Sequence, residues 1–237
     1  MSSRRRRRFA IASPAGEGAR PPLDPDRILA LSYVPGRVRS AVRTLWLLDA
    51  QLGSVVSRGG DPMIRRLKLA WWRDALTALD AAPAPAEPLL QAVAAEVLPL
   101  GVAGAELAEM EEGWAVLLQE EALEPEEFET YASKRGALLF ELTAQLMGGA
   151  LRAEQKSGGM AWALADLSRH SGEPDASAAL DAARGRLKAS TWQSPLRPLG
   201  MLAALAARDA ERGIEAREPQ GWPPRMLRML KLRITGR

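Results

Sequence analysis

The apolar residues of this chain recur every three or four positions, which is the spacing of one helical face. The clearest run consists of Val38, Val42, Leu45, Leu48, Leu52 and Val55. A second run follows an Asp61-Pro62 pair, which is typical of an N-cap with proline in the first helical turn. The apolar stripe predicted for that helix is Ile64, Leu67, Trp71, Ala75 and Ala78.

The rest of the chain continues the helical pattern. Further helices are predicted over 88–98, 103–122, 125–151, 158–170, 195–213 and 223–234. Alanine and leucine, which favour helix, are abundant, and no internal repeat or long Pro/Gly linker divides the pattern. The sequence therefore predicts an all-α fold with one helical domain over 26–237, preceded by a flexible Arg/Pro/Gly-rich tail over 1–25.

Composition narrows the possible chemistry. The chain has 237 residues, of which 47% are apolar, and it contains no cysteine. Those values exclude a wholly disordered chain, a disulfide framework, a thiolate metal site and a cysteine nucleophile. The absence of cysteine also suits a reducing compartment, and we expect a cytoplasmic protein.

The net charge of +3 is dominated by the run Arg4–Arg8, without which the chain would carry −2. The run could hold the protein at the inner membrane through anionic lipid, could contact RNA phosphates, or could simply keep a tail solvated. Nucleic acid is the less favoured of the two ligands, because the folded part is nearly neutral. If the tail drives membrane or nucleic-acid binding, deletion of residues 1–20 abolishes the association.

The most distinctive segment is KLAWWRDAL, over residues 68–76. The general behaviour of large aromatic residues predicts that Trp71 packs in the core and that Trp72 flanks it. The segment also resembles the "RLxWWRxAL" element of the squalene/phytoene synthase family. Further segments resemble that family in the same order, namely those at 33–52, 124–149, 184–187, 196–212 and 223–237.

The resemblance implies an isoprenoid synthase-like helical bundle around a central cavity. Enzymes of this family join two prenyl diphosphates, and two DxxxD clusters on facing helices bind the Mg²⁺ that neutralises the diphosphate. The candidates for lining the cavity or binding a ligand here are Tyr33, Arg39, Asp49, Trp71, Trp72, Tyr131, Asp166 and Arg169.

Both aspartate clusters are missing from the matching segments. Gly53 and Ser57 stand at the first pair of aspartate positions, and His170 and Pro174 stand at the second pair. Asp49 falls three or four positions early, so we expect it to point elsewhere and to be solvated. The sequence therefore predicts neither a catalytic residue nor a metal ligand.

The leading hypothesis is a non-catalytic family member, similar to the group that resembles a mitochondrial complex I assembly factor. Its expected role is binding of a prenyl lipid, a quinone or a protein partner, or respiratory-complex assembly, without a cofactor. An alternative is an active Mg²⁺-dependent prenyltransferase that uses Asp49, Asp166 and Asp175. In that case, farnesyl or geranylgeranyl diphosphate would be turned over.

Overall fold

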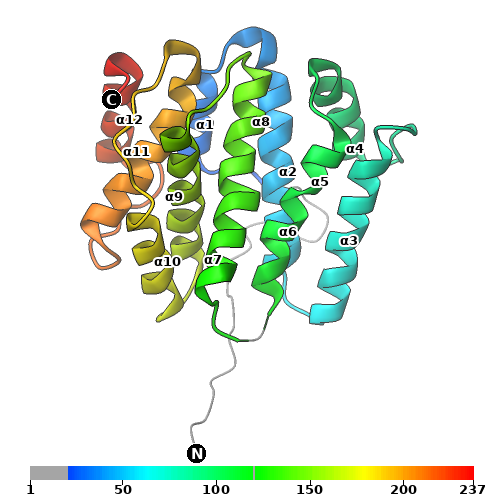
Figure 1. Cartoon of the computed structure of the whole chain (residues 1–237), viewed down its shortest axis with the longest axis horizontal. Helices are drawn as coiled ribbons and strands as arrows, with labels where there is room; N and C mark the ends of the chain where they lie inside the picture. Colours follow the sequence, from blue (N-terminus) through cyan, green and yellow to red (C-terminus); the bar gives the residue numbers. More distant parts are fainter. Residues whose placement is uncertain (1–20, 120) are drawn as a thin grey trace, which may run out of the picture.

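The computed structural model describes residues 21–119 and 121–237, and within these ranges it confirms the all-α prediction. Helices stand side by side, and the described ranges contain no strand (Figure 1). The α-helices are α1 (Pro25–Ser32), α2 (Arg39–Ser57), α3 (Pro62–Ala78), α4 (Pro88–Ala92), α5 (Gly104–Ala108), α6 (Met110–Ala115), α7 (Pro125–Tyr131), α8 (Leu138–Leu146), α9 (Ala153–His170), α10 (Asp175–Arg184), α11 (Arg197–Arg212) and α12 (Pro223–Thr235).

The helices share a single buried apolar core. Helices α7 and α8 form one continuous rod, because the π-helical turn η5 (Ala132–Ala137) joins them. Helix α9 packs against η5 on one side and against α10 and α11 on the other. No helix of the described ranges combines the length and the apolar character needed to cross a membrane.

Two aspartates cap helix N-termini and set where those helices begin. Asp61 accepts a hydrogen bond from the backbone N–H of Met63 at 2.8 Å, as the Asp61-Pro62 signal predicted. Asp24 does the same for Arg27 at 2.9 Å, and it starts α1, a helix that the periodicity did not predict. Leu23 is already buried, so the fold begins slightly before the predicted boundary at 26. Residues 1–20, including Arg4–Arg8, lie outside the described residues.

Other helix limits also differ from the prediction. The helix predicted over 103–122 is divided into α5, α6 and the 3₁₀ turn η4 (Val116–Leu118), and it ends at Leu118 because Gln119 is extended. The helix predicted over 125–151 ends at Leu146, because Gly148 adopts a left-handed φ of 76° and the N–H of Gly149 donates to the Ala144 carbonyl at 2.9 Å. The next helix, predicted from 158, begins at Ala153. Helix α10 was not predicted, although Ala176, Ala179, Leu180 and Ala183 form a buried stripe at helical spacing.

Helix α3 presents the opposite face to the core from the one predicted. Leu69, Trp72 and Leu76 are buried, whereas Trp71 is 46% exposed. The prediction that Trp71 packs in the core and Trp72 flanks it was therefore wrong. Both faces of α3 are apolar, so periodicity alone could not identify the buried one. The two indoles contact edge to face, with ring centroids 5.2 Å apart.

Glycines allow the central helices to approach closely. A Cβ at Gly136 would lie 2.4 Å from the Gly159 carbonyl oxygen, and one at Gly159 would lie 2.7 Å from the Gly136 oxygen. On α6, a Cβ at Gly113 would lie 2.9 Å from the backbone nitrogen of Arg135. The backbones of α6, η5 and α9 are therefore in near contact on both sides of Arg135.

We expect Gly136→Ala to lower the free energy of unfolding by about 1–3 kcal/mol, because the added methyl group has no space between the helices. Gly36→Ala is the control, since a Cβ there meets nothing within 4 Å. Urea denaturation of both variants measures the effect. Equal stability of the two variants would show that the close approach is not a constraint.

Candidate functional site

Charged and polar side chains meet in the interior, where α1, α2, α9 and the α7–η5 rod come together. We call this group the central cluster, and its members are Arg27, Asp49, Tyr131, Arg135 and Asp166. Asp49 is fully buried and Arg135 is 1% exposed, while the Asp166 side chain is 12% exposed. Charges at this depth are costly unless they are paired, so their partners define the site.

The guanidinium of Arg135 joins the two carboxylates. Its Nε donates to Asp49 Oδ1 at 2.9 Å, and its Nη2 donates to Asp49 Oδ2 at 3.1 Å and to Asp166 Oδ2 at 2.7 Å. Its Nη1 donates to the hydroxyl of Tyr131. The contact with Asp49 is bidentate, which is the strongest geometry between arginine and a carboxylate.

Asp49 has two more donors. Arg27 Nη1 donates to Oδ2 at 2.9 Å, and the indole Nε1 of Trp114 donates to Oδ1 at 3.1 Å. A carboxylate offers about four acceptor sites, and Asp49 accepts four hydrogen bonds. No lone pair of this carboxylate is left for a metal ion.

Aromatic rings enclose the Arg135 guanidinium. Its Cζ lies 4.3 Å from the ring centroid of Trp114, 4.9 Å from that of Trp162 and 5.4 Å from that of Tyr131. Ring faces at these distances attract a cation. They also exclude water, which strengthens the ion pairs with the carboxylates.

The cluster shifts the titration of its members. Burial alone would raise the pKa of Asp166, but Arg135, His170 and Arg27 outweigh it and hold that pKa well below its usual range. Burial would likewise lower the pKa of Arg135, but Asp49, Tyr131 and Asp166 raise it well above its usual value. Both groups are therefore charged at neutral pH.

The four positions that match the family's metal-binding aspartates hold no metal site. A Cβ on Gly53 would lie 2.7 Å from Trp114 Cη2, so the indole occupies the space of any longer side chain. The Ser57 hydroxyl donates to the Ser54 carbonyl at 3.2 Å. His170 Nε2 lies 3.5 Å from Asp166 Oδ1, and Pro174 is exposed.

The side chains present do not fit the Mg²⁺ ions that the family uses. Among the described residues, no three acidic or histidine side chains are grouped so that they could hold a metal ion. The two carboxylates nearest to the expected site already bind arginine. Magnesium prefers an octahedral set of oxygen ligands, and this donor set provides no such arrangement.

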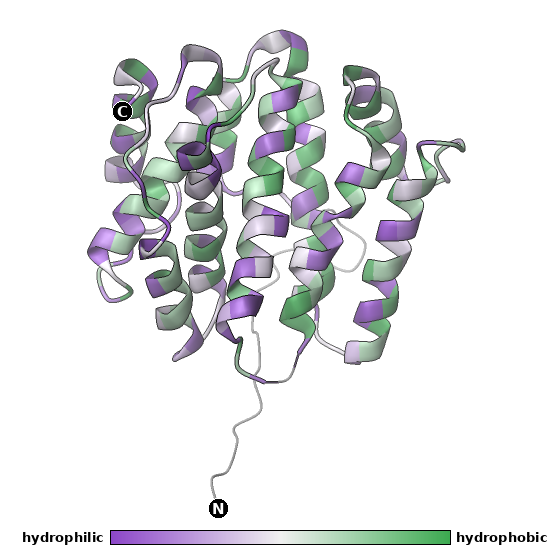
Figure 2. Ribbon diagram, in the orientation of Figure 1, coloured by the Kyte–Doolittle hydropathy of each residue, from purple (hydrophilic) through white to green (hydrophobic). Residues whose placement is uncertain are grey.

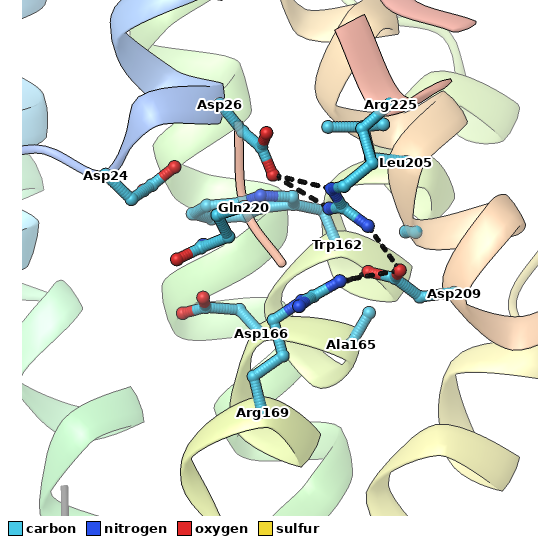
Figure 3. A pocket seen from close by; sticks show the side chains of 11 residues that line it. Asp24, Asp26, Trp162, Ala165, Asp166, Arg169, Leu205, Asp209, Gln220 and Arg225 are labelled. Atoms are coloured by element: carbon cyan, nitrogen blue, oxygen red, sulfur yellow. Dashed lines mark hydrogen bonds and ion pairs between the residues drawn. The ribbon is translucent and has the colours of Figure 1, made fainter. Parts of the chain in front are cut away.

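Beside the central cluster lies a cavity of about 20 Å³, which is bounded by Trp162, Asp166 and Arg169 among others (Figure 3). That volume is enough for about one water molecule, whereas ligand pockets measure roughly 300–1,000 Å³. The cavity cannot accommodate a prenyl chain. At this point, the interior of the bundle is filled by side chains.

On the far side of that cavity, a second charged network ties four helices together (Figure 3). Arg225 of α12 donates from Nη2 to Asp26 of α1 at 2.8 Å, and it also donates to Asp209 of α11. Arg169 of α9 donates to the same Asp209 at 2.6 Å. All of these side chains are almost completely buried. Arg169, which the sequence suggested as a cavity residue, lines this small cavity and also holds helices together.

The structure brings together three of the predicted site residues, Asp49, Tyr131 and Asp166. The expectation that Asp49 points elsewhere and is solvated was wrong. The face of α2 that carries Asp49 is turned to the interior, because Leu45, Leu48 and Leu52 around it are buried. Asp49 therefore lies close to the position of the family's metal site, but its carboxylate binds Arg135.

The other predicted residues lie away from the central cluster. Arg39 donates to the carbonyls of Ser32 and Val34 and so caps the end of α1. Arg233 lies over the ring of Tyr33 with Cζ 5.4 Å from the centroid. Trp71 and Trp72 are on α3, at the edge of the molecule (Figure 1).

The sequence interpretation missed three members of the site and its immediate surroundings, namely Arg27, Trp114 and Arg135. One signal was available for Arg135. It follows Tyr131 by four positions, so the two side chains share a helical face with the apolar residues of that segment. A cationic residue on an inward-facing stripe indicates a buried acidic partner.

A comparison with models of known protein families finds a match, and the matched segment includes the residues of the central cluster. The family model described as squalene/phytoene synthase matches residues 22–188, a span that contains every member of the central cluster. No curated protein and no solved structure matches the chain.

Replacing Arg135 by Met should destabilise the fold by about 3–5 kcal/mol, because it leaves Asp49 and Asp166 buried with too little positive charge. The matched control is Arg43→Met on the exposed side of α2, which should change stability by less than about 0.5 kcal/mol. The double variant Asp49→Asn/Arg135→Met should recover part of the loss. Chemical denaturation measures all three, and a neutral Arg135→Met would contradict the assigned role.

Acid should destabilise the wild type more than the Asp166→Asn variant. The folded-state pKa of Asp166 lies below its unfolded value of about 4, so its stabilising contribution is present above that value. It is lost as the pH falls from about 4 through the folded-state pKa. Urea denaturation between pH 7 and pH 3 measures the difference, with Asp181→Asn on the exposed face of α10 as control. Parallel curves for wild type and Asp166→Asn would refute the assignment.

Proposed function

Because the chain belongs to the squalene/phytoene synthase family, we propose that it is a non-catalytic member in which an internal arginine takes the place of the metal ions. The observation that carries the proposal is the position of Arg135, whose guanidinium bridges Asp49 and Asp166 in the closed centre of the bundle. A guanidinium supplies positive charge to the carboxylates. It has no vacant site at which a diphosphate oxygen and a carboxylate could be coordinated together.

Catalysis would require a large rearrangement. A prenyl diphosphate ionises only if its leaving group is neutralised, and the family achieves this with Mg²⁺ on aspartates. Here, Mg²⁺ would have to displace Arg135 and Arg27 from a fully buried carboxylate, at the cost of breaking buried ion pairs. Two prenyl chains would also need space that Trp114, Trp162 and Tyr131 occupy.

Because the cavity beside the central cluster measures only about 20 Å³, we infer that the protein acts through its surface. We therefore favour a binding role, such as respiratory-complex assembly by analogy with the assembly factor-like group, over storage of an isoprenoid or quinone inside the bundle. If such a lipid binds, it binds on the outside. A cytoplasmic location with contact to the inner membrane is part of this proposal.

One observation favours the alternative of an active prenyltransferase. Asp49 and Asp166 reach the same point of the interior from two facing helices, as the family's metal-binding aspartates do. An enzyme of this kind would need Arg135 to leave the carboxylates when substrate binds. Asp175, the third carboxylate considered for this activity, is the first residue of α10, the helix that follows α9 in the chain.

The test is incubation with farnesyl or geranylgeranyl diphosphate and Mg²⁺, followed by mass spectrometry for squalene or phytoene. We expect no product, and we expect no Mg²⁺-dependent rise in Tm with either diphosphate, because the carboxylates are already satisfied. Turnover that is abolished by Asp166→Ala but kept by the exposed Asp181→Ala would overturn the proposal.

A further inference from the structure

Helix α3 carries a row of large apolar side chains that no part of the described chain covers. We call this row the α3 stripe, and it consists of Met63, Ile64, Leu67 and Trp71. Their exposed fractions are 62%, 51%, 63% and 46%. Single exposed apolar residues are common, but four that share one helical face form a continuous patch.

The α3 stripe is on the outside of an outermost helix. The opposite face of α3 is the buried one and packs against α2, α5 and α6. Figure 1 shows α3 at one edge of the molecule, and hydrophobic positions recur along it in Figure 2. The stripe is therefore convex, and it can lie on a flat surface. It is not a groove of the kind that binds a helix of another protein.

Cations surround the stripe. Lys68 and Arg66 are exposed on α3 itself, and Arg58 is exposed in the turn before it. Between positions 58 and 78 the chain has five basic and two acidic residues, although residues 21–237 as a whole carry a small net negative charge. The two aspartates are engaged, since Asp61 caps α3 and Asp74 accepts hydrogen bonds from Arg73.

We propose that the α3 stripe docks this protein on the surface of a membrane that contains anionic lipid. An apolar helical face with an interfacial tryptophan inserts at the boundary between headgroups and acyl chains, while adjacent lysine and arginine side chains bind the lipid phosphates. Charge complementarity is the reason to choose a lipid surface over a second copy of this chain, which would bring the same cations together. This inference rests on the proposed contact with the inner membrane and names the surface that makes it, and it does not depend on whether the protein is an enzyme.

The experiment is co-sedimentation of the full chain with vesicles of phosphatidylcholine, alone or with phosphatidylglycerol. We expect binding to the anionic vesicles, weakened by high salt, and a loss of at least about tenfold in Ile64→Glu/Leu67→Glu. The matched control is Ile28→Glu, because Ile28 is 55% exposed on α1, which lies apart from α3 in Figure 1. This control should bind as the wild type does.

A second measurement reports the depth of Trp71. Brominated phosphatidylglycerol should quench part of the tryptophan fluorescence of the wild type, and that part should be missing in Trp71→Phe. Three results would overturn the proposal. They are no binding to anionic vesicles, undiminished binding of Ile64→Glu/Leu67→Glu whatever the effect of deleting residues 1–20, and a change in oligomeric state caused by the stripe variant.

Discussion

The ion pairs between Arg135 and the carboxylates of Asp49 and Asp166 are the interaction on which the rest of this structure depends. A charge without a partner at this depth would destabilise the protein by several kcal/mol, so each member of the cluster requires the others. The close packing of η5 makes these ion pairs possible. Gly136 and Gly159 bring two backbones into contact, and that contact places the guanidinium between helices instead of at their surface.

The same interaction decides what kind of chemistry the centre can support. A metal ion and a guanidinium both neutralise carboxylates, but only the metal retains exchangeable positions for a substrate. In this chain the neutralising group is covalently part of the fold, and it is enclosed by Trp114 and Trp162. The replacement of Gly53 by an aspartate would not restore the family's site by itself, since the Trp114 ring covers that position.

Helix period and capping chemistry made most of the elements predictable, because they act within a few residues. The Asp61-Pro62 start of α3 is an example. The faces of the helices were harder, since α3 is apolar on two sides and only its neighbours decide which side is buried. The central cluster was predictable only in part. Asp49 and Asp166 could be found by resemblance to the family, but the pairing of Asp49 with Arg135 joins residues 86 positions apart, and that distance is not encoded in any local pattern.

The network around Asp209 also bears on where this domain ends. The family match stops at residue 188, yet Asp26 and Arg169, which lie within it, find their counter-charges on α11 and α12. A fragment cut at the family boundary would lose the partners of both side chains and the helices that cover them. The folding unit is therefore longer than the segment that matches the family model. Helices α11 and α12 are part of it, because they supply the ion-pair partners of α9 and α1.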